Sequence, residues 1–286
     1  MSFNAKTLYA LFRFFALNFL TTGVFMKIRI LLLLMLVFGL NFMALSQPKI
    51  KFLSIGLNAS GDLKITRADG KRLGFDAITK KSYNEIPDAT ISTSRDREPV
   101  YRLPIIDSEK SFTIKVFGRK DNKKADLAIT GENFVVRFVG LSLVEGKIFT
   151  IKISPQGNNI TFSCNKKTEL PTFTFAVDSP DANQASYILK LNRTDFNVAK
   201  LLNIILDSNN ILRFKDNDKP NAVYTLNIIK INADGTENTF SSPEITSKNA
   251  NNFELDFNKW NGTEGICLRN DKNRNGFKDE KCLNLK

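Results

Sequence analysis

Side-chain oxygens are concentrated near the C-terminus, in a stretch between two cysteines. Asp271, Asn273 and Asn275 stand at alternate positions, Gly276 follows directly, and Asp279 comes shortly after. Carboxylate and amide oxygens are ligands that Ca²⁺ prefers, and a glycine permits the sharp turn that a binding loop makes around an ion. These residues are therefore the candidate metal site.

The spacing Asp-x-Asn-x-Asn-Gly-x-x-Asp resembles the first nine positions of EF-hand-like calcium loops, including those of dockerins and thrombospondin type 3 repeats. The resemblance implies four side-chain ligands and one backbone carbonyl, in chain order Asp271, Asn273, Asn275, Phe277 (the carbonyl) and Asp279. Where these loops carry a bidentate Glu the chain has Cys282, so we expect weak Ca²⁺ binding, with a Kd of about 10⁻⁴–10⁻³ M. The alternative is a metal-free hairpin with an Asn-Gly turn.

Cys267 and Cys282 flank this loop, and we expect them to form a disulfide. If residues 265–268 and 281–285 pair as strands, the two sulfur atoms can meet across the hairpin. Closing a loop of about 15 residues contributes roughly 3 kcal/mol in the chain-entropy description. Cys164 is left over, and we expect it to be a buried, small apolar residue, with intermolecular pairing as the alternative.

The chain contains no histidine. This excludes Ser-His-Asp and Cys-His nucleophilic catalysis and also His-ligated zinc sites. Asp and Glu are plentiful, so a carboxylate pair for glycoside hydrolysis remains an alternative, although no spacing singles one out. The single tryptophan, Trp260, is expected in the core, with stacking on a sugar as the alternative.

The first 46 residues predict a targeting segment rather than part of the fold. Residues 26–29 are basic, residues 30–45 form an almost unbroken apolar run, and Ala44 and Ser46 supply the small residues of a signal-peptidase site. An apolar run of about 16 residues is short for a spanning helix, which needs roughly 20. We therefore expect a signal peptide, export, and no membrane span in the mature chain.

A second apolar stretch, residues 8–25, precedes this segment and is broken only by Arg13. We expect translation to begin at Met26 and the mature chain to begin near Gln47. The alternative is an uncleaved anchor of two helices that holds the protein at the cell envelope. Removing residues 1–46 takes away four basic residues and no acidic one, which lowers the net charge from +12 to +8.

Basic side chains are dispersed along the mature chain, where they alternate with apolar neighbours as on the solvent face of strands. A nucleic-acid-binding surface would show a clustered basic patch or a recognisable motif, and the sequence contains neither. We therefore expect no nucleic-acid partner.

Apolar and polar residues alternate with a period of two, as in half-buried antiparallel strands. Turn residues separate these runs at intervals of roughly 8–12 residues, which is typical of a sandwich or barrel. The expected strands include 63–67, 101–103, 112–116, 149–153, 173–177, 186–191, 201–206, 211–214, 222–231, 253–257 and 265–268. Residues 195–206 form the only plausible helix. The fold class is all-β.

A polar stretch over residues 165–171 ends in a proline and predicts a boundary. We expect two antiparallel β-sandwich-like modules behind the signal peptide. The first covers residues 47–165, and the second covers residues 171–286 and ends in the disulfide-closed hairpin. Each is long enough to bury a core of its own.

Residues 67–87, RADGKRLGFDAITKKSYNEIP, resemble a motif of uncharacterised secreted bacterial proteins that reads D-P-x-G-R-R-x-G-[YF]-D-x-x-T-G-x-x-x-N-E-I-P. Strands that follow the motif in those proteins are similar to residues 101–104 and 112–118, and their continuation is similar to residues 224–235. The resemblance implies β architecture and export from a bacterial cell. No activity is attached to it.

Arg67, Ala68, Ala77 and Lys80 stand where the related sequences have Asp, Pro, Pro and Gly. Two turn-forming prolines and one glycine are thus missing, which affects turn geometry more than fold. We expect the motif to be structural, with the Phe75 ring in the core. The alternative is a ligand-binding edge made by Arg72, Asp76, Asn84 and Glu85.

These features predict a secreted or cell-surface, non-enzymatic interaction or structural protein whose partner is an extracellular protein or a polysaccharide. The alternative is a secreted carbohydrate-active enzyme or a carbohydrate-binding module. Two facing carboxylates in a cleft would favour the enzyme, whereas a flat surface without a pocket would favour the interaction protein.

Overall fold

Alternating burial explains why the chain forms strands. In β1 (Lys51–Leu57) and β10 (Ile148–Ile153) every second residue is buried, so one face of each strand packs on the core and the other meets solvent. The computed structural model describes residues 51–58, 61–94, 97–106, 110–120, 123–168, 170–178, 185–193, 202–207, 211–216, 223–242, 245–246, 252–260, 262, 265–270 and 279–283.

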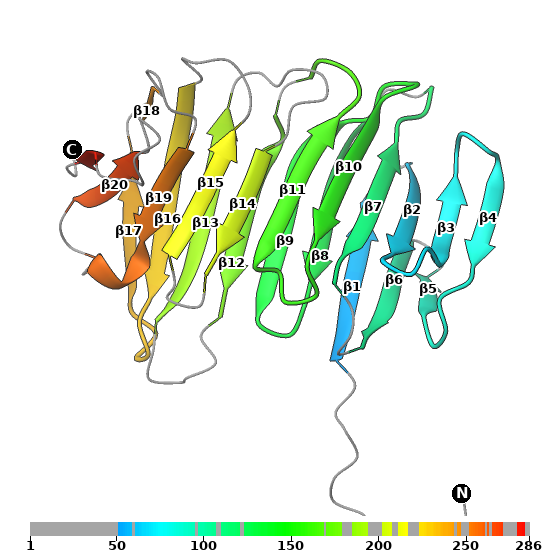
Figure 1. Ribbon diagram of the computed structural model, residues 1–286, viewed down its shortest axis with the longest axis horizontal. Helices are drawn as coiled ribbons and strands as arrows, with labels where there is room; N and C mark the ends of the chain where they lie inside the picture. The colour runs from blue at the N-terminus through cyan, green and yellow to red at the C-terminus, as the bar shows by residue number, and fades with distance from the viewer. Residues whose placement is uncertain are drawn as a thin grey trace, which may run out of the picture. The chain divides into compact units, whose positions relative to one another are not determined.

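The described strands form two antiparallel sheets (Figure 1). In spatial order, sheet A contains β17 (Glu237–Ser241), β16 (Val223–Ile231), β13 (Ser186–Arg193), β12 (Thr172–Val177), β9 (Phe134–Ser142), β8 (Lys124–Thr130), β1, β6 (Arg97–Ile105) and β5 (Thr90–Ser94), with β18 (Ile245–Thr246) also paired to β16. Sheet B contains β21 (Asp279–Leu283), β20 (Ile266–Asn270), β19 (Asn252–Asp256), β15 (Ile211–Asp216), β14 (Leu202–Leu206), β11 (Asn159–Cys164), β10, β7 (Phe112–Phe117), β2 (Asp62–Arg67), β3 (Arg72–Asp76) and β4 (Lys81–Asn84).

The inner faces of the two sheets share one hydrophobic core. Phe138 of sheet A stacks on Phe162 of sheet B with ring centroids 4.9 Å apart, and Phe214 of sheet B meets Tyr224 of sheet A edge-on at 5.8 Å. Aromatic pairs of this kind contribute beyond the area that they bury. The all-β, sandwich-like fold class predicted from periodicity is confirmed.

Both sheets continue across the boundary predicted at residues 165–171. On one side, β12 pairs with β9 along its whole length, and on the other, β11 pairs with β14. Strands of the two predicted modules therefore lie side by side in the same sheets, and Ile50–Lys286 form one compact unit.

Most predicted strands coincide with observed strands to within a few residues. Of the stretch with a possible helix, residues 202–206 form the strand β14, and its earlier part lies outside the described residues. The helical element of the described chain is a single 3₁₀ turn, η1 (Phe257–Lys259). Within the described residues, no helix is long and apolar enough to span a membrane.

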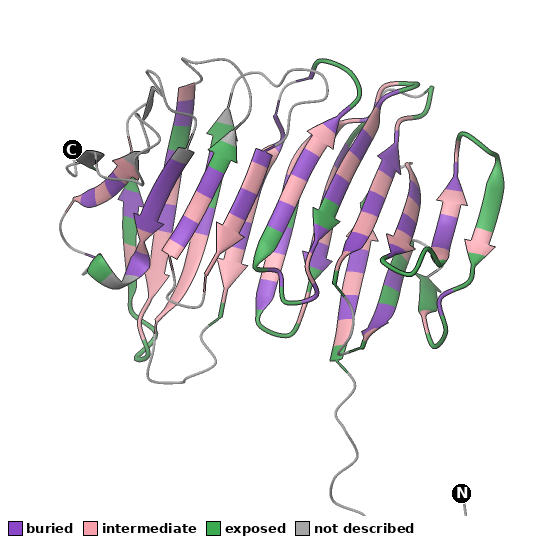
Figure 2. Ribbon diagram, in the orientation of Figure 1, coloured by how far each residue is buried: buried purple, intermediate pink, exposed green. Residues whose placement is uncertain are grey.

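One end of the sandwich has lightly packed edges (Figure 2). The edge strand β4 of sheet B buries none of its residues fully, and residues 90–93 of the edge strand β5 of sheet A are exposed. A strand whose outer edge has no partner packs on one side only, which explains this exposure. The motif of residues 67–87 lies at this end.

Candidate functional site

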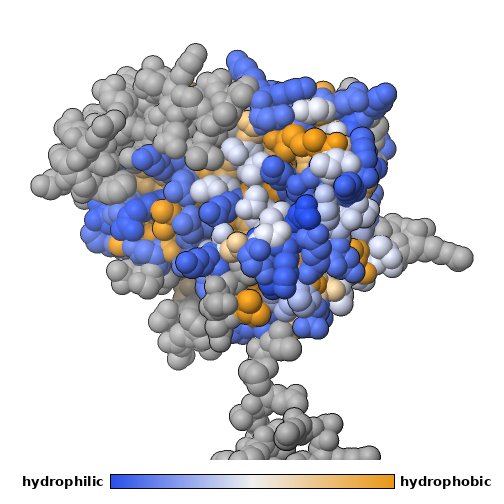
Figure 3. Space-filling view, turned by 45° about the vertical axis from the view of Figure 1, so that its right-hand side comes forward, coloured by the Kyte–Doolittle hydropathy of each residue, from blue (hydrophilic) through white to orange (hydrophobic). Residues whose placement is uncertain are grey.

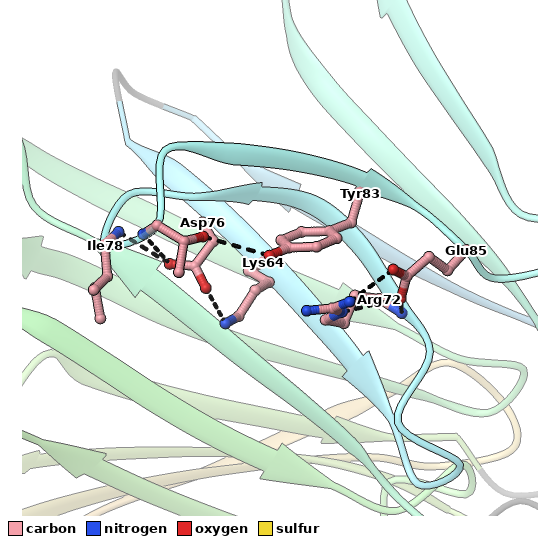
Figure 4. Close-up of polar contacts among 7 residues, drawn as sticks. Lys64, Arg72, Asp76, Ile78, Tyr83 and Glu85 are labelled. Carbon is pink, nitrogen blue, oxygen red and sulfur yellow. Dashed lines mark hydrogen bonds and ion pairs between the residues drawn. The ribbon is translucent and has the colours of Figure 1, made fainter.

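The motif forms a three-stranded unit, β2–β3–β4, which we call the motif hairpin (Figure 4). Arg72 reaches Glu85 through two nitrogens, at 3.0 and 2.8 Å, and its backbone N–H donates to the same carboxylate at 3.0 Å. The Arg72 guanidinium also lies 3.8 Å from the centroid of the Tyr83 ring. A bidentate pair with a stacked aromatic ring fixes the arginine in one orientation.

Asp76 is a second anchor of the motif hairpin (Figure 4). Its carboxylate pairs with Lys64 and accepts hydrogen bonds from the backbone N–H groups of Ile78 at 2.9 Å and Thr79 at 3.4 Å. The hydrogen bond from Lys64 lowers the pKa of Asp76, and the hydrogen bond from Arg72 lowers the pKa of Glu85. Both carboxylates therefore stay charged at neutral pH and remain paired with Lys64 and Arg72.

These contacts bear on the two interpretations of the motif. Arg72, Asp76 and Glu85, proposed as an alternative binding edge with Asn84, are bound to partners within the motif hairpin, which favours a structural role. The prediction that Phe75 enters the core is wrong, since Phe75 is only half-buried. Its strand lies beside the exposed edge strand β4, and Leu73 and Ile86 are the buried apolar residues of the motif instead.

Two glycines, Gly74 in the motif and Gly118 directly after β7, stand where a larger residue would collide with the backbone. Gly74 has a φ of +97°, and a Cβ there would lie 2.2 Å from the Leu63 carbonyl oxygen. A Cβ on Gly118 would lie 2.0 Å from the Val144 carbonyl oxygen, where the two segments form a bridge. Lys80, at the position where the related sequences have glycine, has a φ of +56°. The left-handed turn is therefore kept with a residue that tolerates it less well.

A cleft of about 560 Å³ opens beside the motif hairpin, on the outer side of sheet B. Its walls come from the start of β2, the β3–β4 turn, the end of β7 and the turn before β10. The lining residues are Asp62, Ala77, Ile78, Lys80, Phe117, Gly118, Arg119, Lys120, Glu145, Gly146, Lys147 and Ile148. In the view of Figure 3 hydrophilic side chains predominate, and hydrophobic ones form separate patches.

Phe117 forms an aromatic floor for the cleft. Thr113 and Lys115 of the same strand face outward, and the alternation places Phe117 on that outer face as well. Phe117 is nevertheless only 2% exposed, and it does not belong to the core between the sheets. It is therefore buried by the cleft walls. Ile78, which is 66% exposed, adds an apolar rim.

Cations outnumber carboxylates in this lining. Of the two carboxylates, Asp62 is paired with Arg119. Lys147 is buried, and its ammonium donates to the Thr168 hydroxyl at 3.1 Å, while no carboxylate of the described residues pairs with it. The same ammonium lies 6.0 Å from the centroid of the buried Phe149 ring, so it is directed toward Thr168 and Phe149. Lys80 and Lys120 are the exposed cations of the lining, and they favour a negatively charged group in the cleft.

Sequence reasoning missed this cleft. Its four segments are far apart in the chain, and only strand pairing brings them together, with Asp62 and Ile148 both opposite Phe117. One local signal was present. Phe117-Gly118 breaks the strand alternation, and Gly118 is a glycine that permits the close approach of another backbone segment.

The C-terminal hairpin forms as predicted. Cys267 and Cys282 are directly opposite one another on β20 and β21 and form a disulfide. Of the proposed calcium ligands, Asp271, Asn273, Asn275 and Phe277 lie outside the described residues. Asp279 begins β21, and its side chain is not among those described. Calcium binding therefore stays a prediction, and the described residues contain no cluster of His, Cys, Asp and Glu that could hold a metal.

A row of ion pairs joins this hairpin to β19 and β15, its neighbours in sheet B. Arg213, Glu254 and Arg269 are opposite one another on β15, β19 and β20. Glu254 is only 4% exposed, accepts from Arg213 at 2.6 Å and also pairs with Arg269. A buried carboxylate needs such partners, so the row of ion pairs also specifies the strand register.

Two further predicted residues lie in the core. Trp260 is 3% exposed and meets Phe240 edge-on at 6.4 Å, which confirms the packing role expected for it over sugar stacking. Cys164 is 2% exposed and is a free thiol, and burial raises its pKa.

The candidate site is thus a cation-lined cleft with an aromatic floor. It lies beside the motif hairpin, whose charged side chains form ion pairs with one another. Its geometry indicates binding of a negatively charged group. Comparison of the chain with protein-family models, with curated proteins and with solved structures finds no match, so the function rests on this geometry.

Proposed function

We propose that this chain is a secreted or cell-surface, non-enzymatic interaction protein that binds an extracellular partner, a protein or a polysaccharide, through the cleft beside the motif hairpin. One observation carries the proposal. With Asp62 occupied by Arg119, the cleft retains Lys80, Lys120 and Lys147 against a single carboxylate, Glu145. An anionic group of the partner would balance this excess of charge.

Export has separate support. The basic and apolar residues before Gln47 have the layout of a signal peptide. The Cys267–Cys282 disulfide agrees with this, because disulfides persist in oxidising compartments and are rare in the cytosol. N-terminal sequencing of the native protein should find a mature chain that begins at or near Gln47.

A small-anion screen tests the cleft. Sulfate and galacturonate should raise the Tm of the mature protein, and neutral galactose should not, because a ligand bound only to the folded state stabilises it. The double variant Lys80→Ala/Lys120→Ala should lose the shift, whereas Lys167→Ala, an exposed lysine outside the cleft, should keep it. Equal shifts in all three proteins would reject the cleft as the binding site.

A second candidate function is supported by the presence of two carboxylates, Asp62 and Glu145, in the same cleft. Glycosidases use two carboxyl groups, one of them as the acid. The pairing of Asp62 with Arg119 argues against free catalytic use of that carboxylate. Release of new reducing ends from a polysaccharide, lost in both Asp62→Asn and Glu145→Gln, would establish the enzyme instead.

A further inference from the structure

The outer face of sheet B carries polar side chains in rows that cross the strands. One row, with members directly opposite one another on successive strands, contains Arg72, Thr66, Thr113, Lys152, Thr161, Asn203 and Lys215. The adjacent row contains Lys64, Lys115, Thr150 and Ser163. Neighbouring strands are about 4.8 Å apart, so each row presents a polar group at that interval.

We use the term basic face for the outward positions of β7, β10, β11, β14 and β15, the central strands of sheet B (Figure 1). These positions are Thr113, Lys115, Phe117, Ile148, Thr150, Lys152, Asn159, Thr161, Ser163, Asn203, Ile205, Ile211, Arg213 and Lys215. None of them is Asp or Glu. The basic face is therefore hydroxyl-rich and positively charged.

Three lysines of the basic face have no carboxylate partner in the part of the chain that the structure describes. Lys152 and Lys215 are exposed and Lys115 is half-buried, and none of them forms an ion pair with the carboxylates of the described chain. Lys115 and Lys152 are diagonal neighbours on adjacent strands, a separation of about 7–8 Å. Like charges so placed repel one another, and a bound polyanion would relieve that repulsion.

Among the described residues, the carboxylates near the basic face lie at its flanks and at the ends of its strands. Asp207, after β14, pairs with Arg213, and Glu145 lies in the cleft before β10. On one flank Asp76 pairs with Lys64, and on the other Glu254 pairs with Arg213. The outward positions of the central strands therefore carry positive charge without an acid among them, and the paired residues at the two flanks limit the width of the face.

We propose that the basic face binds a single chain of an acidic polysaccharide that runs across the strands. Lys115, Lys152 and Lys215 would pair with its carboxylates or sulfates. The Thr, Ser and Asn side chains between them can both donate and accept hydrogen bonds, as sugar hydroxyls require. The interval between strands is close to the length of one sugar residue in an extended chain, so successive sugars would meet successive strands.

Other polyanions fit this surface less well. Single-stranded nucleic acids bind by stacking bases on exposed aromatic rings, and the one aromatic residue of the basic face, Phe117, is buried. Membrane surfaces favour several large exposed apolar residues beside the cations. Of the four such residues described, Ile91, Val100 and Ile106 lie on or beside sheet A, and Ile78 alone lies near the basic face, at the cleft rim. Sheet twist of roughly 20° per strand bends the rows, which suits one flexible chain and not a flat crystalline fibre.

This inference deepens the proposed function by naming the class of partner, and it rests on that proposal only in taking the protein to be a binding protein. The two surfaces share Phe117 and Ile148 at their common border, but their lysines are separate, so they can fail separately. The cleft is altered by Lys80→Ala/Lys120→Ala, and the basic face by Lys152→Ala/Lys215→Ala.

Calorimetric titration of the mature protein with polygalacturonate oligomers tests the basic face, with neutral dextran oligomers of equal length as the comparison. We expect binding to polygalacturonate alone, weakened by added NaCl as exposed charges are screened. Lys152→Ala/Lys215→Ala should raise the Kd roughly tenfold, since each exposed ion pair contributes modestly. Lys124→Ala/Lys190→Ala, which removes the same charge from exposed positions of sheet A, should change it less than about twofold.

Four outcomes would overturn the proposal. They are the absence of polygalacturonate binding, equal binding to dextran, an equal loss in the sheet A variant, and tighter binding to single-stranded oligonucleotides or to anionic phosphatidylserine vesicles than to polygalacturonate. If Lys80→Ala/Lys120→Ala abolishes binding and Lys152→Ala/Lys215→Ala does not, the ligand belongs to the cleft, so the basic face is rejected while the proposed function stands.

Discussion

At the scale of single residues, the backbone explains why particular residues stand in the motif and directly after β7. Gly74 and Gly118 stand where a Cβ would meet a carbonyl oxygen at 2.2 and 2.0 Å, so no other residue fits without movement of the backbone. Lys80 is different, because space is available and only its φ of +56° is unfavourable.

Replacing Lys80 by glycine tests this reading. Lys80→Gly removes the cost of a left-handed Lys, partly offset by the greater freedom of glycine in the unfolded chain, and should stabilise the protein by about 0.5 kcal/mol. The matched control Lys81→Gly, in the adjacent strand β4, should destabilise it by up to about 1 kcal/mol. Urea unfolding measures both, and destabilisation by Lys80→Gly would show that the Lys80 side chain matters more than its φ.

The carboxylates of the motif predict a dependence on pH. Side-chain hydrogen bonding from Arg67 lowers the pKa of Asp69 to about 2, and Arg72 and Lys64 lower those of Glu85 and Asp76. A carboxylate with a lowered folded-state pKa stabilises the protein above its unfolded pKa, and this contribution is lost as the pH falls through the folded pKa. Stability should therefore decline from about pH 4.5 toward pH 2.

Tm measured between pH 6 and pH 2 checks this expectation. The decline should be smaller in Glu85→Gln, which no longer has the carboxylate that titrates, although its Tm at pH 6 should be lower than that of the wild type. Glu237→Gln, on the exposed edge strand β17, should behave as the wild type does. A wild-type Tm that stays constant down to pH 2 would contradict the assignment.

At the scale of elements, the C-terminal hairpin is held by a disulfide and by ion pairs. The disulfide joins opposite residues of β20 and β21, with a sequence separation of 15, and the row of ion pairs of Arg213, Glu254 and Arg269 joins the hairpin to its neighbours. The loop that the disulfide closes contains the predicted calcium ligands.

Calcium titration tests that loop. With a Kd near 1 mM, about 10 mM Ca²⁺ should stabilise the mature protein by roughly 1.4 kcal/mol and raise the Tm by about 2–4 °C. Asp271→Ala should abolish the rise, because it removes the first predicted ligand. Asp234→Ala, in a turn between β16 and β17, should retain it. A rise that survives in Asp271→Ala would assign the calcium effect to another part of the chain.

At the scale of the whole molecule, the two predicted modules share both sheets and one core. A strand such as β12 packs with β9 on one side and β13 on the other, so neither half can be removed without exposing buried apolar surface.

Unfolding of the mature protein should therefore be a single cooperative transition. Its calorimetric and van't Hoff enthalpies should agree, as they do when no intermediate is populated. Two separated transitions, or a calorimetric enthalpy well above the van't Hoff value, would show that residues on either side of the 165–171 stretch unfold independently.

The amino-acid sequence by itself determined the elements. A period of two in apolar residues predicted β7, β10 and β16, because a half-buried strand must alternate, and the position of the cysteines predicted the disulfide. It did not single out β9, whose outward Val135 and Val139 are apolar and only partly buried, so the alternation is weak there. The signal peptide and the calcium loop remain predictions outside the described residues.

Only the tertiary structure decided which strands are neighbours, and with it the cleft and the basic face. Phe117 becomes a cleft floor because Asp62 and Ile148 lie opposite it. Lys152 and Lys215 share a row because three pairings connect β10 to β15. Lysines that appear dispersed in the sequence gather on one face in this way. Hydrogen-bond register between distant segments is a non-local property, and local periodicity carries no information about it.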